Sequence, residues 1–124
     1  MGEDLLKLDV SFEDEPKEDV LAALAGAGAK VKELNQKGMT GVEIVVAAVL
    51  AANALANLLL KFLPLWKCGI VVDTRGARVL TRKDCKLPRG SVLIVGKKGT
   101  EVKLQQPSEI ELNSTIQALL GEKK

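Results

Sequence analysis

Residues 41–63 read GVEIVVAAVLAANALANLLLKFL, the longest apolar stretch of the chain. As one helix they would be about 34 Å long at about 1.5 Å per residue, which covers a hydrocarbon core of about 30 Å. The same residues could instead form the buried central helix of a small soluble domain. The sequence therefore predicts one long hydrophobic helix over residues 41–66, a candidate transmembrane helix, and leaves its surroundings open.

Polar residues would form a stripe along this helix. Its members are Glu43, Asn53, Asn57 and Lys61. At about 100° per residue they fall within an arc of roughly 80°. In a membrane the stripe would face other copies of the helix or a water-filled lumen, because unpaired amides and charges are costly against lipid. A ladder of small residues, Ala48, Ala52 and Ala56, would let such helices approach closely. In a soluble domain the stripe would face solvent.

Charge is divided unevenly around the long stretch, although the net charge is only +2. Residues 1–20 are rich in Asp and Glu, whereas residues 61–103 are rich in Lys and Arg. If the helix spans a membrane, the excess of cations places the C-terminal part in the cytoplasm. The chain opens on acidic residues rather than on a basic and then apolar region, so we expect cytoplasmic synthesis and association with the inner membrane.

Several classes of chemistry lack their usual residues. The chain has no His, which is the commonest general base and a common metal ligand. The sequence contains no P-loop, GxSxG motif, paired-Cys zinc spacing or dinucleotide fingerprint. Aromatic residues make up only 2%, which argues against stacking on single-stranded nucleic acid. We therefore expect a protein that is not an enzyme, with no catalytic residue, cofactor, metal ion or nucleic-acid partner.

The acidic segment before the long stretch, residues 1–40, is expected to hold a strand and a helix. Residues 5–12 alternate between apolar and polar side chains, which is typical of a strand. Pro16 and the acids around it suit the start of a helix that runs to about residue 25. Residues 30–36 fit either a short strand or a helix end. Thr40, with Glu43 three residues later, would form a capping box for the long helix, and Pro64 would end that helix.

The basic segment, residues 67–124, is expected to hold two β-hairpins and a C-terminal amphipathic helix. The strands of the hairpins are residues 69–73 with 78–81 and residues 91–95 with 101–104. Ser108, with Glu111 three residues later, would cap the helix over residues 108–120. The sequence thus predicts an α+β fold in which one long hydrophobic helix accompanies a small antiparallel hairpin sheet. For 124 residues we expect one domain overall.

The register of the first hairpin decides whether Cys68 and Cys85 meet. A turn over residues 73–76 pairs Val71 with Val79 and leaves the two cysteines out of opposition. A two-residue loop would place them opposite each other. We favour the first register, because the cysteines of a cytosolic protein are expected to be reduced.

Four features follow one another along the chain: the turn GMTG at residues 38–41, the long Ala- and Leu-rich helix, the strand pair VLIVGKKGTEVKL at residues 92–104, and the terminal amphipathic helix. In this order they resemble the small effector-associated constant component family of bacterial NTP-dependent conflict systems, over residues 30–63 and 91–120. The resemblance implies a non-catalytic component of a bacterial immunity module, which acts beside a protease or another effector and a regulatory ATPase. It implies no catalytic residues, and the hairpin at residues 69–82 lies outside the pattern.

The polar stripe favours a membrane-acting component as the first function hypothesis. Copies would associate into a homo-oligomer through the long helix, with Asn53 and Asn57 facing inward and Lys61 at the mouth. The acidic N-terminal segment would restrain the basic half until a signal or a cleavage releases it. The protein would then be a pore-forming or membrane-disrupting effector of antiviral defence.

The second hypothesis is a soluble α+β adaptor that docks onto a protease or an ATPase. Its basic hairpin turns would supply the contacts to this partner, because clustered cations favour an acidic surface. The candidate contact residues are Arg75, Arg78, Lys97 and Lys98.

Overall fold

The computed structural model of the chain describes residues 5–13, 17–37, 43–66 and 68–121. Within these ranges the elements follow one another as β1 (Leu5–Glu13), α1 (Lys17–Gly26), β2 (Lys30–Lys37), β3 (Glu43–Ala51), the short 3-10 helix η1 (Ala52–Ala54), α2 (Leu55–Trp66), β4 (Gly69–Asp73), β5 (Val79–Asp84), β6 (Ser91–Val95), β7 (Glu101–Gln105) and α3 (Glu109–Leu120).

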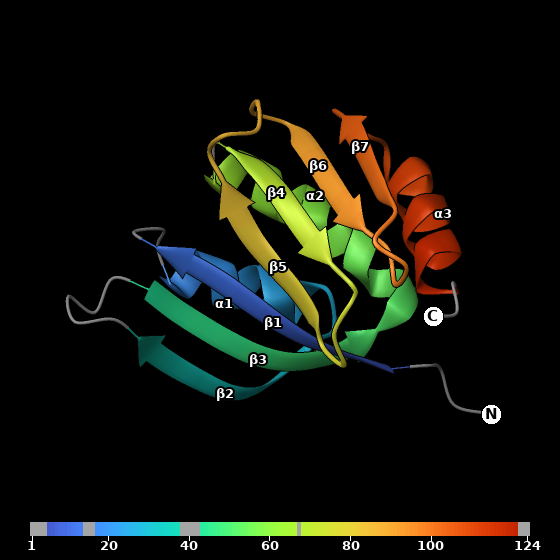
Figure 1. Cartoon of the computed structure of the whole chain (residues 1–124). Coiled ribbons are helices and arrows are strands. Elements are labelled where there is room, and N and C mark those ends of the chain that lie inside the picture. Colours follow the sequence, from blue (N-terminus) through green and yellow to red (C-terminus); the bar gives the residue numbers. More distant parts are fainter. Residues whose placement is uncertain (1–4, 14–16, 38–42, 67, 122–124) are drawn as a thin grey trace.

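The strands join in one seven-stranded mixed sheet with the order β2-β3-β1-β5-β4-β6-β7 (Figure 1). Neighbouring strands are antiparallel except in two parallel pairs, β1 with β5 and β4 with β6. The acidic segment supplies β1, which lies between β3 and β5 in the interior of the sheet. The expected small antiparallel hairpin sheet is therefore wrong, because the sheet also recruits strands from the N-terminal half of the chain.

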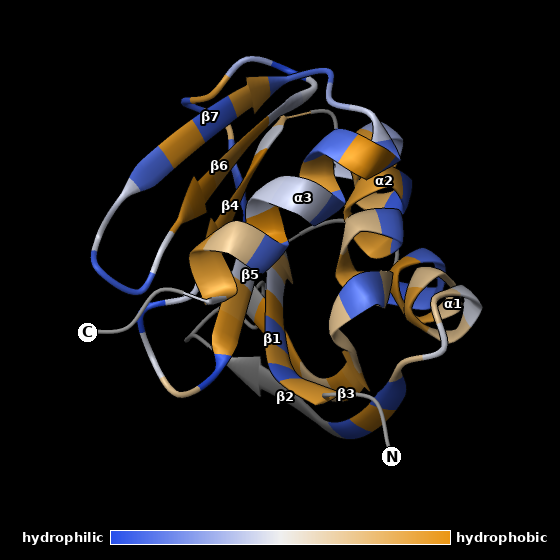
Figure 2. Cartoon of the chain, turned by 90° about the vertical axis from the view of Figure 1, so that its right-hand side faces the viewer, coloured by the Kyte–Doolittle hydropathy of each residue, from blue (hydrophilic) through white to orange (hydrophobic). Residues whose placement is uncertain are grey.

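The three helices cover one face of this sheet, as Figure 2 shows. The strands alternate accordingly: in β1, Leu8 and Val10 are fully buried under the helices, whereas Asp9 between them points to the other face. The central helix, α2, packs against both α1 and α3. No described helix lies on the opposite face, which we call the open face of the sheet.

Residues 41–63 do not form the long helix that the sequence predicts. Residues 43–51 are β3, which pairs with β1 on one side and β2 on the other, and α2 begins only at Leu55. The β-branched residues of this segment favour a strand, and these residues are Ile44, Val45, Val46 and Val49. Among the described residues, no helix is both long enough and apolar enough to cross a membrane. The transmembrane helix, and the fold class built around it, are therefore wrong.

The second half of the apolar stretch does form a helix, and its buried face belongs to the core. The fully or almost fully buried side chains of α2 are Leu55, Ala56, Leu58, Leu59, Phe62 and Trp66. Phe62 stacks on Trp66 with ring centroids 4.5 Å apart. The prediction that Pro64 ends the helix is wrong, because Pro64 lies within the last turn of α2. The predicted capping box begins at Thr40, outside the described residues, and Glu43 belongs to β3.

Several local predictions are confirmed. The N-terminal strand and the helix after it occur as β1 and α1, and residues 30–37 adopt the strand alternative as β2. Both C-terminal hairpins form, as β4 with β5 and β6 with β7. The capping box of α3 is complete: the Glu111 N–H donates to the Ser108 hydroxyl at 3.1 Å, and the Ser108 N–H donates to the Glu111 carboxylate at 3.3 Å.

The favoured register of the first hairpin is wrong. Val71 pairs with Arg82 rather than with Val79, and Gly69 pairs with Asp84. This register places Cys68 and Cys85 beside the last pair of the hairpin, where they form a disulfide with a Cα–Cα distance of 4.8 Å. The cause is the length of the connection, residues 74–78, which is longer than the expected tight turn.

Candidate functional site

Two turns that are distant in sequence lie side by side at one end of the sheet. They are residues 74–78, between β4 and β5, and residues 96–100, between β6 and β7. The buried Thr74 donates to the Val95 carbonyl oxygen twice, from its backbone N–H at 2.9 Å and from its hydroxyl at 2.7 Å. Lys97 Nζ donates to the Gly76 carbonyl oxygen at 3.4 Å. These bonds join the two turns into one surface, which we call the basic end.

The basic end gathers the four contact residues that the sequence predicts. Arg75 and Arg78 lie on the first turn, and Lys97 and Lys98 lie on the second. Because the turns are joined by hydrogen bonds, these four side chains occupy the same end of the sheet.

Arg75 is oriented by the last residue of β4. Its Nε lies 3.0 Å from Asp73 Oδ1 and its Nη2 lies 2.8 Å from Asp73 Oδ2, while its backbone N–H also donates to Oδ1 at 3.0 Å. The side-chain hydrogen bond from Arg75 lowers the pKa of Asp73 against the opposing effect of partial burial, and the same pair raises the pKa of Arg75. The Arg75 side chain nevertheless stays 59% exposed, so it is positioned but still accessible.

Arg78 is half-buried and forms an ion pair with a strand of the sheet. Its Nε lies 2.8 Å from Oδ1 of Asp9, which β1 presents on the open face of the sheet. This ion pair joins the first turn to β1, which is parallel to β5. Lys98 is exposed and Lys97 is half-buried. Of the four predicted contacts, Arg75 and Lys98 are therefore the most accessible to a partner.

The predicted polar stripe is distributed over three elements. Glu43 lies on β3, Asn53 on η1, and Asn57 and Lys61 on α2. The chain changes from an extended strand to a helix between residues 51 and 55, so positions that would share one helix face no longer line up. The stripe therefore does not exist as a surface.

The small-residue ladder is lost for the same reason. Ala48 lies on β3, Ala52 on η1 and Ala56 on α2. Ala48 and Ala56 are fully buried in the core, so neither can contact the helix of another copy.

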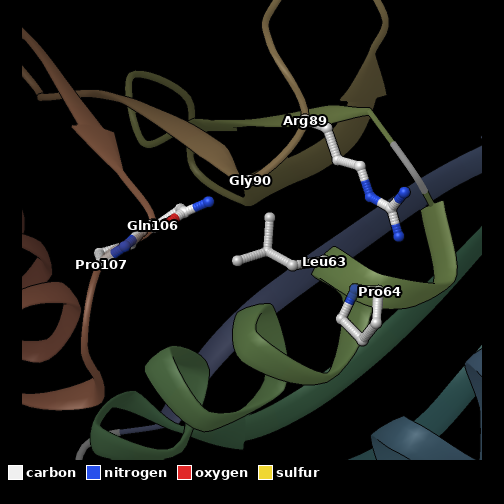
Figure 3. Close-up of a pocket in the computed structure, with 6 residues that line it drawn as sticks. All are labelled: Leu63, Pro64, Arg89, Gly90, Gln106 and Pro107. Atoms are coloured by element: carbon white, nitrogen blue, oxygen red, sulfur yellow. The ribbon is translucent and has the colours of Figure 1, made fainter.

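A pocket of about 560 Å³ lies elsewhere on the molecule, and no sequence motif predicts it. Its walls come from the end of α2, the connection between β5 and β6, and the link between β7 and α3. The lining residues are Leu63, Pro64, Arg89, Gly90, Gln106 and Pro107. Figure 3 shows Leu63 between Arg89 on one side and Gln106 on the other. Gln106 has φ 46°, and its backbone N–H donates to the Gly90 carbonyl oxygen at 2.8 Å. Gly90 and Pro107 look like ordinary strand-end residues in the sequence.

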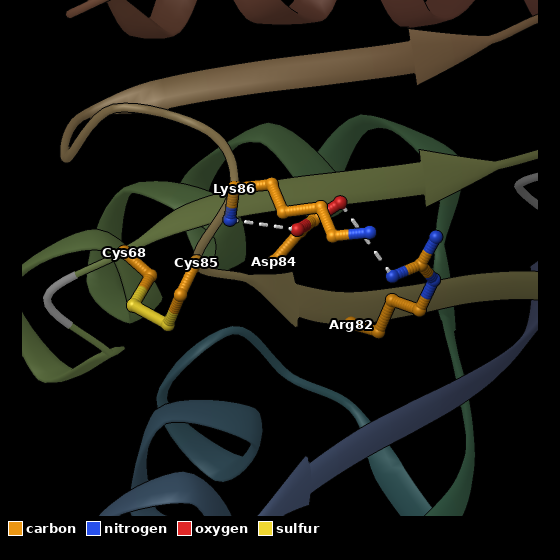
Figure 4. The surroundings of a disulfide bond; sticks show 5 residues. All are labelled: Cys68, Arg82, Asp84, Cys85 and Lys86. Atoms are coloured by element: carbon orange, nitrogen blue, oxygen red, sulfur yellow. Dashed lines mark hydrogen bonds and ion pairs between the residues drawn. A yellow bond between two sulfur atoms is a disulfide. The ribbon is translucent and has the colours of Figure 1, made fainter.

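The opposite end of the sheet, which we call the disulfide end, comprises Cys68, Gly69 and the β5–β6 connection, residues 85–90. Figure 4 shows the Cys68–Cys85 bond beside Asp84, which accepts the backbone N–H of Lys86 at 2.9 Å. Leu87 packs so closely over Gly69 that a Cβ at position 69 would collide with it. This end is thus closed by a covalent bond and tight packing.

The described residues contain no cluster of three or more Cys, Asp and Glu side chains that could hold a metal ion. No protein-family model, no curated protein and no solved structure matches the chain. The function must therefore be inferred from the geometry of the chain itself.

Proposed function

We propose that this chain is a non-catalytic binding module that docks onto an acidic surface of a larger protein through its basic end. The observation that carries the proposal is the junction of the two turns by Thr74 and Lys97. It gathers basic side chains from positions 75–78 and 97–98 on one rigid support. Loops positioned by a rigid scaffold are a common place for binding residues.

The charges at this end favour an acidic partner. Asp73 and Asp9 engage Arg75 and Arg78, and the second turn adds two further cations, Lys97 and Lys98. Exposed ion pairs contribute only about 0.2–1 kcal/mol each. We therefore expect the cations to act mainly by accelerating association and excluding basic partners, with a marked dependence on salt.

The membrane-acting hypothesis has lost the helix on which it was based, because the described residues contain no spanning helix. The resemblance to the effector-associated constant component family stays a prediction. It supplies the classes of partner to examine first, a protease or a regulatory ATPase. Association with the inner membrane also stays a prediction, and it would now need a basis other than the long helix.

The test is a charge reversal at the basic end, Lys97→Glu with Lys98→Glu. A matched control, Lys61→Glu with Lys86→Glu, changes the net charge by the same amount at exposed residues away from the basic end. Each variant is used as bait in extracts of the cells that produce the protein, and any protein captured by the unaltered chain is then titrated directly. We expect at least about tenfold weaker binding for the basic-end variant and little change for the control.

Equal losses in the two variants would show a general charge effect and would contradict the proposal. Flotation with phosphatidylglycerol vesicles tests whether the basic end binds anionic lipid instead of a protein. If the unaltered chain binds these vesicles and no protein partner, the basic end recognises anionic lipid and the proposed protein-binding function is wrong.

A further inference from the structure

Strand β7 is one of the two outer strands of the sheet, and among the described residues it pairs with β6 alone. Figure 2 places it at the margin of the sheet, while the helices lie against the face. An outer strand carries a row of backbone donors and acceptors that can pair with another strand. The sequence of β7 is EVKLQ.

The hydrogen bonds at both ends of β7 show which of its backbone groups point outward. The Gly96 N–H donates to the Thr100 carbonyl oxygen, and the Gln106 N–H donates to the Gly90 carbonyl oxygen. In an antiparallel pair, bonded residues alternate along the strand. The even-numbered residues of β7 therefore bond inward to β6, and the backbone groups of Glu101, Lys103 and Gln105 face away from the sheet.

We propose that two copies of this chain associate by antiparallel pairing of β7 with β7, about a two-fold axis at Val102. In this register Glu101 of each copy lies opposite Lys103 of the other, so each outward-facing donor and acceptor of these residues is paired. The two Glu–Lys pairs stand on the open face, where opposite charges in direct opposition stabilise a sheet. A two-fold axis gives a closed dimer rather than a growing filament.

Charge selects this register over its neighbours. In the dimer, a residue whose backbone groups face outward must lie opposite another such residue of the second copy. The two-fold axis can therefore pass through a residue of β7 but not between two residues. An axis at Lys103 would place the two Lys103 side chains opposite each other, and an axis at Glu101 would do the same for the two Glu101 side chains. Like charges directly opposite are unfavourable. Lys103 thus disfavours other registers of pairing at this edge of the sheet and favours the register with the axis at Val102.

The apolar side chains of β7 support the same axis. Val102 and Leu104 point toward the helix face and are only partly buried against the core. About an axis at Val102, the two Val102 side chains meet in a non-hydrogen-bonded pair, where the Cα atoms of facing residues are about 4.5 Å apart. The interface is shorter than that of a stable complex, so we expect a weak, concentration-dependent dimer.

The experiment is sedimentation velocity on the full chain from about 5 µM to about 500 µM, with three charge variants. Glu101→Lys alone and Lys103→Glu alone each place like charges opposite each other. We expect each to weaken the dimer at least about tenfold, and the double variant Glu101→Lys with Lys103→Glu to restore it. Recovery in the double variant distinguishes pairing in this register from a loss of folding.

A second pair of variants tests the backbone. Lys103→Pro removes an N–H that faces outward and makes no bond to β6, so the fold should persist while the dimer is lost. Lys103→Ala keeps that N–H and loses only the charge pair, so it should retain a weaker dimer. Circular dichroism confirms the fold of each variant. A chain that stays monomeric at every concentration, or a dimer unaffected by both single charge variants, would overturn the proposal.

Discussion

The basic end and the disulfide end are held together by different kinds of bond. At the basic end, hydrogen bonds from Thr74 and Lys97 join two turns and leave charged side chains at the surface. At the disulfide end, the Cys68–Cys85 bond and the packing of Leu87 over Gly69 close the connection between β5 and β6. We infer that the disulfide end contributes mainly to stability and the basic end mainly to recognition.

Removing the disulfide should have the largest effect on stability. The bond closes a loop with a sequence separation of 17, and a loop of this size is worth about 3 kcal/mol in the chain-entropy model. Cys68→Ala with Cys85→Ala should therefore lower the free energy of unfolding by about 2–4 kcal/mol, as measured by urea denaturation. An unaltered urea midpoint would show that the disulfide end does not contribute mainly to stability.

Substitution of one glycine at each end compares how tightly the two ends are packed. Gly69→Ala should cost about 1–3 kcal/mol, because its Cβ would collide with Leu87. Gly76→Ala at the basic end is the matched control: its Cβ would come no closer than 3.7 Å, to the Arg78 carbonyl oxygen, and its stability should change little. Thermal unfolding of both variants gives the comparison. Similar losses at the two positions would mean that the basic end is packed as tightly as the disulfide end.

A smaller effect is expected from Thr74→Val. The change keeps the volume and the backbone N–H bond but removes the hydroxyl bond to the Val95 carbonyl oxygen. A net loss of about 0.5–1.5 kcal/mol is expected from one hydrogen bond of this kind. Hydrogen exchange should show faster opening of residues 74–78 and unchanged exchange at residues 85–90. Faster exchange at both ends would show that the two are coupled.

The smallest effect concerns the Asp73–Arg75 pair. The folded state lowers the pKa of Asp73, so the pair stabilises the fold above the ordinary carboxyl pKa, and this contribution is lost as pH falls through the lowered value. Arg75→Ala should raise the pKa of Asp73, as followed by NMR titration of its carboxyl carbon. It should also reduce the loss of stability on acidification. A pKa that does not move would mean that Arg75 is not held by Asp73 in solution.

How far the sequence predicts this fold is clearest in the two halves of the apolar stretch. The 43–51 half carries β-branched residues at four of its nine positions, a local preference for a strand that the run of Ala residues obscured. The 55–66 half has no β-branched residue and forms α2. The length of the apolar stretch, taken alone, favours one helix. Strand pairing with β1 and β2 decided the outcome, and pairing between distant segments leaves little trace in one sequence.

The candidate site shows the same division. The basic turns and the capping box of α3 depend on residues close in sequence, and their positions were predictable. The junction of the two turns depends on the Thr74 bond to Val95, which spans distant residues. The hairpin register and the disulfide likewise depend on contacts between separated residues, Gly69 with Asp84 and Cys68 with Cys85. The pocket beside Arg89 likewise brings together α2, the β5–β6 connection and the β7–α3 link.

The most direct test of the proposed function is hydrogen–deuterium exchange on the chain with and without its captured partner. We predict slower exchange in residues 74–78 and 96–100 on binding, with no change in residues 85–90. Protection confined to residues 85–90, or absent from both turns of the basic end, would contradict it.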